Sequence, residues 1–148
     1  TMKYPFRCIL IVCLSVLASS SLFSQQEAKV VDKKKHKVVF QLTSGDTLVH
    51  KAMVRQIGHL LEAAPNSKIE VVCHSAGLPF LVTNQTKQAE KIKELKNRGV
   101  EFYACENSMR DKNVKKSDLL PESGTVPSGI VEVVLKQEKG WSYIKAGF

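Results

Sequence analysis

The sequence predicts an α/β fold, a three-layer α/β/α sandwich with a mostly parallel sheet of about five strands. Short apolar runs rich in β-branched residues alternate with longer stretches in which apolar residues recur every three or four positions. This alternation is typical of strands and amphipathic helices that follow one another in βα units. The second and third strand-like runs also end in polar, turn-forming residues, at the sheet edge where open α/β folds place their ligand sites.

Residues 1–24 have the pattern of a secretory signal peptide. Lys3 and Arg7 make the start positive, an apolar run extends from Cys8 to Ala18, and cleavage is expected after Ser20 or Ser24. The apolar run is shorter than the roughly 20 residues of a transmembrane helix, so an uncleaved membrane anchor is the less favoured alternative. We expect a bacterial protein that is periplasmic or secreted and contacts the membrane only through this segment.

Residues 25–36 are polar and charged and predict a flexible lead-in, and residues 37–148 are long enough for one domain with its own core. The net charge of +8 falls to +6 when Lys3 and Arg7 are removed with the signal peptide. The basic residues are spread along the chain, whereas a nucleic-acid surface interleaves them with exposed aromatic side chains. We therefore expect a solvated basic surface and no nucleic-acid partner.

The domain begins with a strand, a helix and a second strand. Val38–Leu42 is apolar and β-branched, and a polar loop separates it from the next element. The helix is predicted from about Thr47 to Ala64, where apolar residues recur at helical spacing. Ile69–Cys73 is the second strand, and it ends in the polar segment that begins with His74.

The next segment predicts a second βα connection. Leu78–Val82 is an apolar loop or short helix, which we expect to form a pocket wall or a subunit contact. Asn84 is placed to cap a lysine-rich helix from Gln85 to Arg98. Gly99 is expected to close that helix in a left-handed conformation.

The rest of the chain predicts further βα alternation. After a third strand at Val100–Ala104, Asn107 or Ser108 is expected to cap a short helix around Ser108–Val114. The remaining predicted elements are a very short strand at Thr125–Val126, a helix over Ile130–Lys139 that is apolar at Ile130, Val131, Val134 and Leu135, and a closing strand at Trp141–Ala146.

Cys105 is the main candidate for chemistry, because it lies where the third strand meets a helix amino end. Such an end carries partial positive charge and free N–H groups, which stabilise a thiolate and lower the pKa of the thiol. Arg110 or Lys112 can supply a nearby cation, whereas Glu106 opposes ionisation. The alternative is that Cys105 is a small buried residue of the core.

Other kinds of site find little support in the sequence. There is no glycine-rich phosphate loop and no Gly-x-Ser-x-Gly nucleophile elbow. Cys73 and Cys105 stand alone in the sequence, so their spacing excludes a zinc site built from cysteine pairs, and a mixed site with His74 is only weakly indicated. We expect no metal and no cofactor, and any chemistry is expected to depend on cysteine.

Two segments resemble the DsrE/DsrF-like sulfur-relay family. The stretch Gly99–Met109 is similar to the pattern Gly-Val-x-Phe-x-x-Cys-x-Asn-Thr-Met that carries the family cysteine, with Ser108 in the place of the common Thr. The closing segment of the family resembles Val126-Pro-Ser-Gly129-Ile, Gln137 and Gly140-Trp141-Ser-Tyr143-Ile144-Lys. The resemblance covers about Lys37 to Phe148.

The resemblance implies a small α/β domain that assembles as a homo-oligomer, a trimer or hexamer. It implies that Cys105 accepts persulfide sulfur and exchanges it with a sulfur donor or acceptor protein, as a sulfurtransferase or sulfur carrier. From their positions, His74, Asn107, Ser108 and Arg110 are the residues expected to bind substrate or support the cysteine.

Two other functions stay open at this point. One is a non-catalytic oligomeric protein of the cell envelope that binds a ligand or partner at the same edge, with His74, Asn107 and Ser108 as the polar lining. The other is a thiol redox protein that uses Cys73 as a second thiol beside Cys105. Neighbouring parallel strands rarely meet disulfide geometry, which favours two separate thiols.

Overall fold

A computed structural model describes residues 30–147 of the chain. The predicted signal peptide and residues 25–29 of the lead-in lie outside the described residues. Within the described part, no helix is long and apolar enough to cross a membrane. The elements in chain order are β1 (Lys37–Leu42), α1 (Thr47–Ala63), β2 (Lys68–Cys73), the 3-10 helix η1 (Ser75–Leu81), α2 (Ala89–Asn97), β3 (Glu101–Cys105), α3 (Glu106–Asp111), the 3-10 turn η2 (Lys116–Asp118), β4 (Ser123–Val126), α4 (Gly129–Glu138) and β5 (Ser142–Lys145).

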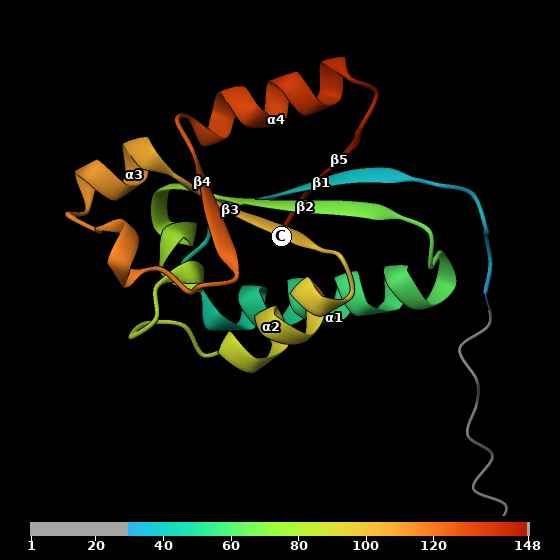
Figure 1. The fold of residues 1–148 in the computed structure, drawn as a ribbon, viewed down its shortest axis with the longest axis horizontal. Helices are drawn as coiled ribbons and strands as arrows, with labels where there is room; N and C mark the ends of the chain where they lie inside the picture. Colours follow the sequence, from blue (N-terminus) through green and yellow to red (C-terminus); the bar gives the residue numbers. More distant parts are fainter. Residues whose placement is uncertain (1–29, 148) are drawn as a thin grey trace, which may run out of the picture.

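The five strands form one parallel sheet in the order β4-β3-β2-β1-β5. The chain moves stepwise from β1 to β4 and then returns across the sheet to place β5 on the far side of β1. Because parallel crossovers are right-handed, a return in the opposite direction puts its helix on the opposite face. Figure 1 shows this arrangement, with α1 and α2 below the sheet and α4 above it. The predicted three-layer α/β/α sandwich is confirmed.

The main core lies between the sheet and the layer of α1 and α2. Val49, Met53 and Ile57 of α1 pack onto the sheet together with Ile92 and Leu95 of α2. The side chain of Asp46 begins α1 by accepting a hydrogen bond from the N–H of Leu48 at 2.8 Å. The helical periodicity of the sequence thus identifies the buried side of α1 correctly.

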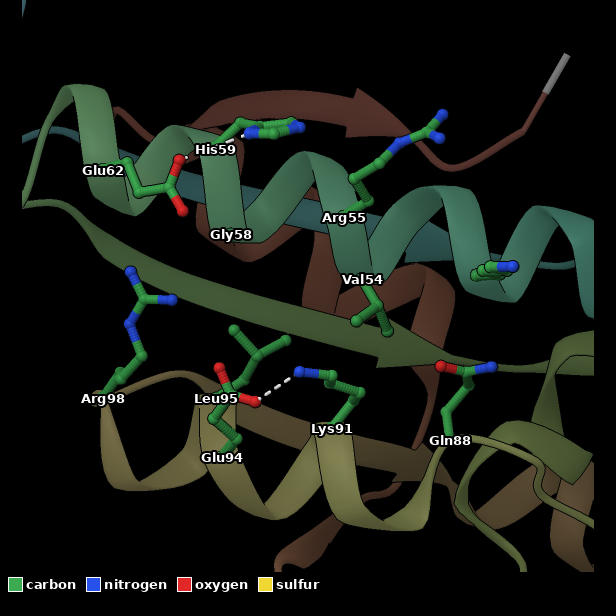
Figure 2. A pocket seen from close by; sticks show the side chains of 11 residues that line it. Val54, Arg55, Gly58, His59, Glu62, Gln88, Lys91, Glu94, Leu95 and Arg98 are labelled. Carbon is green, nitrogen blue, oxygen red and sulfur yellow. Dashed lines mark hydrogen bonds and ion pairs between the residues drawn. The ribbon is translucent and has the colours of Figure 1, made fainter. Parts of the chain in front are cut away.

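A groove of about 320 Å³ runs between the outer surfaces of α1 and α2 (Figure 2). Val54 and Leu95 line its floor, and Arg55 and Arg98 lie at its sides. Lys91 also borders the groove, but it is paired with Glu94 at 2.7 Å. The groove therefore has an apolar floor and sides of mixed charge.

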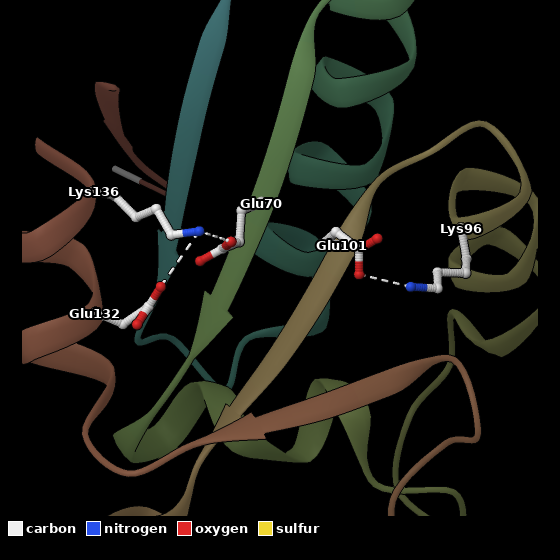
Figure 3. Close-up of polar contacts among 5 residues, drawn as sticks. All are labelled: Glu70, Lys96, Glu101, Glu132 and Lys136. Atoms are coloured by element: carbon white, nitrogen blue, oxygen red, sulfur yellow. Dashed lines mark hydrogen bonds and ion pairs between the residues drawn. The ribbon is translucent and has the colours of Figure 1, made fainter. Parts of the chain in front are cut away.

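The opposite face of the sheet is covered by α4 and has a small apolar cluster of its own. Val39, Val72 and Val126 of the strands pack there with Val133 of α4, beside Tyr103 and Trp141. A buried charge lies among them, because Glu70 of β2 is only 2% exposed. Its carboxylate pairs with Lys136 of α4, which also lies 3.4 Å from Glu132 (Figure 3).

α4 therefore turns Val133 and the charged residues Glu132 and Lys136 toward the sheet, and most of its apolar residues away from it. We call the four residues that face outward the outer stripe of α4. Their exposed fractions lie between 40% and 53%, for Ile130, Val131, Val134 and Leu135. The apolar residues that identify this helix in the sequence thus point away from the core, because Glu70 on the sheet attracts Lys136.

The start of the second helix is predicted wrongly. α2 begins at Ala89 and not at Gln85, and Asn84 does not cap it. The N–H groups of Gln85 and Thr86 instead bond to the carbonyl of Val82, and the hydroxyl of Thr86 accepts from the N–H of Gln88. These turn contacts compete with helix formation, as Thr and Asn side chains commonly do. Gly99 has the predicted left-handed conformation, with φ of 91°.

Two further local predictions are corrected. α3 covers Glu106–Asp111 instead of Ser108–Val114, and Cys105 itself occupies the cap position in place of Asn107 or Ser108. The segment Leu78–Val82, expected as an apolar loop or short helix and as a pocket wall or subunit contact, belongs largely to η1. Leu78 and Val82 do line a pocket, whereas Phe80 and Leu81 are fully buried in the main core.

Residues 30–36, the described part of the lead-in, form neither helix nor strand. The N–H groups of Val31 and Asp32 bond to the carbonyl of Ala63 at the end of α1. Asn66 donates to the carbonyl of Lys33 at 2.7 Å. These contacts hold the segment against the start of β2.

Candidate functional site

Cys105 lies at a topological switch point of the sheet. It is the last residue of β3 and pairs in register with Val126, the last residue of β4. The chain leaving β3 enters α3, whose Met109 packs into the main core, whereas the chain leaving β4 enters α4 on the opposite face. Open α/β sheets bind ligands where neighbouring connections diverge in this way. Among the described residues, Cys105 is the only cysteine on the side of the sheet that α4 covers. The fold therefore places it at the edge where such sheets usually bind ligands.

The amino end of α4 contacts the Cys105 thiol directly. The backbone N–H of Gly129 donates to Sγ at 3.2 Å. This close approach favours glycine, because a Cβ on residue 129 would be crowded at 3.1 Å from Cβ of His74 and 3.2 Å from Cβ of Cys105. Ser128 caps α4 by accepting from the N–H of Val131, which orients the first turn of the helix toward the cysteine.

The hydrogen bonds around Sγ favour the thiolate. Burial acts to raise the pKa of the Cys105 thiol, since the residue is only 4% exposed. Hydrogen bonds from the N–H of Gly129, the N–H and hydroxyl of Ser108 and the N–H of Asn107 outweigh burial and hold the pKa below its ordinary value. Donors that bond to the charged form of a group favour that form. The predicted low-pKa thiol is thus supported by hydrogen bonds from two helix amino ends.

His74 lies on the same side of the sheet as Cys105. Gly129 packs between the two residues, and His74 is only 7% exposed. The Nε2 atom of His74 lies 2.9 Å from the amide nitrogen of Gln41, and its Nδ1 atom lies 3.0 Å from Oγ of Ser75. Burial lowers the pKa of His74, so the neutral ring is favoured.

Ser108 connects this group to the thiol. Its Oγ accepts a hydrogen bond from the backbone N–H of Ser75 at 2.8 Å, while its hydroxyl acts on the Cys105 thiolate as a donor. Ser75 has φ of 54°, in the left-handed region that non-glycine residues rarely adopt. Such a conformation persists only where the surrounding contacts hold it. The structure thus brings His74, Ser108 and Cys105 into one connected group.

Asn107 and Arg110 lie on the outer side of α3. Both are exposed, and the guanidinium of Arg110 donates to the amide oxygen of Asn107. Glu106 is bound by the hydroxyl of Thr125 at 2.7 Å and by Lys116 at 3.4 Å. Side-chain hydrogen bonds from these two residues lower the pKa of Glu106. Of the predicted supporting residues, Asn107 acts on the thiol through its backbone N–H, and the groups that lower the pKa of the thiol against the effect of burial are all neutral donors.

Cys73 lies on the other side of the sheet. It is in register with Ala104, and both belong to the main core beneath the sheet, whereas Cys105 is the following residue. Successive residues of a strand point to opposite faces, so the two free thiols face away from each other. Burial strongly raises the pKa of Cys73. This geometry argues against a redox pair of Cys73 and Cys105 within one chain.

Two other features of the described residues lie apart from Cys105. Over residues 30–147, no group of three or more His, Cys, Asp or Glu side chains is gathered to hold a metal ion. The groove between α1 and α2 lies on the far side of the main core from the cysteine. Neither feature adds residues to the Cys105 site.

Several residues of this site were not predicted from the sequence. Gly129, Ser75 and Gln41 come from three different connections or strands, and no local motif links them to Cys105. A signal was present at Ser128-Gly129, where a good helix cap precedes a glycine at the first helical position. A glycine there indicates that another backbone or side chain approaches closely.

Comparison with known proteins agrees with the fold. The solved structure of the protein of unknown function MTH1491 from Methanobacterium thermoautotrophicum is similar to this chain, with 30% sequence identity and a TM-score of 0.72. The similarity covers 74% of this chain and 98% of the other. No curated protein matches the sequence. The profile of the DsrE/DsrF-like family matches residues 36–146, and the chain therefore belongs to the DsrE/DsrF-like family.

Proposed function

We propose that this protein is a sulfur carrier or sulfurtransferase that accepts persulfide sulfur on Cys105. Membership of the DsrE/DsrF-like family supports a sulfur-relay role at the level of the family. The observation that carries the proposal is the hydrogen bond from the N–H of Gly129 to Sγ of Cys105, at the switch point of the sheet. A thiolate stabilised in this way is the nucleophilic form that sulfur transfer needs.

The transfer step is an exchange of one sulfur–sulfur bond for another. The Cys105 thiolate attacks the outer sulfur of a donor persulfide, R–S–S–H, and forms a new S–S bond while the donor S–S bond breaks. The donor leaves as the thiolate R–S⁻, and Cys105 carries the outer sulfur together with its proton. Passing the sulfur to an acceptor thiolate is the same step in reverse, so the cycle needs no oxidant or reductant.

The first prediction is that sulfur is gained on Cys105 alone. Intact-mass spectrometry after treatment with a persulfide donor should show a gain of one sulfur atom, and Cys105→Ser should abolish it. Cys73→Ala is the matched control and should keep the adduct, because Cys73 is fully buried and its raised pKa keeps it protonated. An adduct that survives in Cys105→Ser would overturn the proposal. No adduct, with Cys105 also slow to alkylate, would favour the non-catalytic binding protein.

We further propose that the protein forms a homo-oligomer through the outer stripe of α4, in line with the trimer or hexamer that the sequence resemblance implies. Four apolar side chains on one side of a helix are unusual on the free surface of a monomer. A stripe of this kind is complementary to a second copy of itself, and its helix begins at Gly129, next to Cys105. The predicted signal peptide supports the further proposal that this assembly acts in the periplasm or outside the cell.

The second prediction tests this interface. The double substitution Val131→Lys and Leu135→Lys should reduce the oligomer to a monomer in sedimentation equilibrium, since it buries charge at the contact. The fold should tolerate it, because the two side chains are 51% and 40% exposed in the single chain. Leu48→Lys, at a residue 70% exposed on α1, is the control and should leave the mass unchanged. A wild-type monomer, or an unchanged mass in the double variant, would contradict the proposal.

A further inference from the structure

We propose that His74 is a positioning residue for Cys105, which acts through Ser75 and Ser108 and does not serve as the base that deprotonates the thiol. The inference rests on the proposed function, since it explains how the chain prepares Cys105 for sulfur transfer. It assigns a role to Ser75 and Gln41 as well, which no sequence pattern connects to the cysteine.

Both ring nitrogens of His74 are hydrogen-bonded to neighbouring side chains. The amide nitrogen of Gln41 can only donate, so Nε2 of His74 accepts that hydrogen bond and the ring proton resides on Nδ1. The hydroxyl of Tyr143 donates to the amide oxygen of Gln41, which fixes the orientation of the amide. The Nδ1–H group of His74 then donates to Oγ of Ser75 at 3.0 Å. A histidine in this state has no free nitrogen with which to accept a proton.

The side of the ring toward the cysteine is made of carbon. A Cβ placed on Gly129 would lie 3.2 Å from Cδ2 of His74 and 3.2 Å from Cβ of Cys105, so Gly129 separates the ring carbon from the cysteine. A base that serves a thiol needs a ring nitrogen within hydrogen-bond reach of the sulfur. The N–H of Gly129 donates to the sulfur at 3.2 Å, and the N–H groups of Ser108 and Asn107 and the hydroxyl of Ser108 also act to lower the pKa of the thiol.

The influence of His74 reaches the thiol through Ser75. The hydrogen bond from Nδ1 holds the side chain of Ser75, whose backbone has the strained φ of 54°. In that conformation the N–H of Ser75 donates to Oγ of Ser108 at 2.8 Å. This contact occupies a lone pair of Oγ and leaves the hydroxyl hydrogen of Ser108 free to donate to the thiolate, in line with the part that this hydroxyl has in lowering the pKa of Cys105. Hydrogen bonds connected in this way strengthen one another.

The experiment measures the rate at which iodoacetamide alkylates Cys105, as a function of pH and resolved by peptide mass spectrometry in the full chain. Three variants of His74 separate the two ring nitrogens. Asparagine places its amide where Nδ1 lies and can still donate to Ser75, whereas glutamine reaches only the position of Nε2. Phenylalanine keeps the ring and has neither nitrogen.

We expect His74→Phe and His74→Gln to slow alkylation at neutral pH about fivefold, since the thiolate loses the support of one well-placed neutral hydrogen bond. Their rate profiles should shift to higher pH by the matching amount. His74→Asn should stay close to the wild type. A rate that glutamine restores and asparagine does not would overturn the role through Ser75, and so would three variants that all match the wild type or all fall equally.

A substitution at Ser75 tests the same path without depending on how well the His74 variants fold. Ser75→Gly removes Oγ, and glycine adopts a positive φ without strain. Its stability to urea should therefore be at least that of the wild type, while alkylation of Cys105 slows about fivefold, as in His74→Phe. A Ser75→Gly variant as reactive as the wild type would overturn the inference.

The wild-type measurements separate this inference from the proposed function. If wild-type Cys105 reacts no faster than an ordinary thiol and gains no sulfur, the proposed function fails. If wild-type Cys105 reacts rapidly and gains sulfur while the variants of His74 and Ser75 leave its rate unchanged, the proposed function stands and only the positioning role is wrong. His59→Gln is the matched control, since His59 is exposed on α1 and should have no effect.

Discussion

Replacing Lys136 with methionine should lower the free energy of unfolding by about 3–5 kcal/mol at neutral pH, the loss typical of a buried ion pair with one partner removed. Lys136 is the ion-pair partner of Glu70, whose side chain is only 3% exposed, and it also lies over the ring of Trp141 at 4.5 Å. One carboxylate oxygen of Glu70 has no hydrogen-bond partner in the described structure. Without Lys136, a buried negative charge would remain with nothing to balance it.

Acidification should reduce this defect. Burial already raises the pKa of Glu70, even though Lys136 acts to lower it. Removing Lys136 raises that pKa further, so the folded variant binds the proton more tightly than the unfolded chain does. Stability of the variant relative to the wild type should therefore increase as the pH falls through the folded-state pKa of Glu70. Urea denaturation of the variant and of the wild type, at neutral and at mildly acidic pH, measures the difference in stability at each pH.

Two further substitutions test the cause. Lys96→Met breaks the ion pair between Lys96 and Glu101, two side chains that are 35% and 40% exposed. This substitution should lower the free energy of unfolding by less than about 1 kcal/mol. The double variant Glu70→Leu and Lys136→Met should recover most of the stability, because an apolar pair leaves no charge buried. If Lys136→Met cost no more than Lys96→Met, the view that α4 is attached to the sheet by charge would be incorrect.

Gly77→Ala should destabilise the protein by about 3 kcal/mol or more, because it forces one backbone segment into another. A Cβ on residue 77 would lie 2.2 Å from the carbonyl oxygen of Leu42 and 2.7 Å from its carbonyl carbon. That same oxygen accepts the backbone hydrogen bond of His74 at 3.1 Å. The clash can be relieved only by separating η1 from the end of β1, which also displaces His74.

Thermal and urea denaturation of Gly77→Ala give the size of the effect. Gly58→Ala is the control, since it is a helical glycine with nothing within 4 Å of the added carbon, and it should gain about 0.5–1 kcal/mol from helix propensity. A Gly77→Ala protein as stable as the wild type would show that η1 does not lie against the end of β1 as described.

Patterns within single segments were enough to predict the architecture. The apolar periodicity of α1 and the β-branched runs of β1 and β2 are local signals, and each agrees with the element that forms. Local signals failed where side chains compete for the backbone, as at Thr86 before α2, or where a cap position is taken by an unusual residue, as at Cys105. The first outcome comes from turn contacts among Val82, Thr86 and Gln88 that compete with the first turn of the helix, and the second occurs where β3 runs directly into α3.

The sequence was enough to predict the central residues of the candidate site, but not the residues that surround them. Cys105 ends one strand and His74 follows another, so their place at the carboxyl edge of the sheet follows from the chain order. The hydrogen bonds to Gly129 and Ser75 depend on how separate connections pack at that edge. The orientation of α4 depends on Glu70, a charged residue within a buried strand. Sequence alone gives no reason to match that residue with Lys136, which lies 66 positions later.

The strand order also determines when, during synthesis on the ribosome, the cysteine can acquire its final environment. β1 to β4 lie side by side in the order in which they are translated, so the emerging chain can pair them one after another. Gly129, which donates to Sγ, is translated 24 residues after Cys105, and Lys136 and β5 follow it. A nascent chain that lacks α4 therefore presents Cys105 without its closest donor and leaves β1 as an open edge. The environment of the reactive thiol is therefore completed only after β1 to β4 have been translated, and the sheet itself closes later still, when β5 pairs with β1.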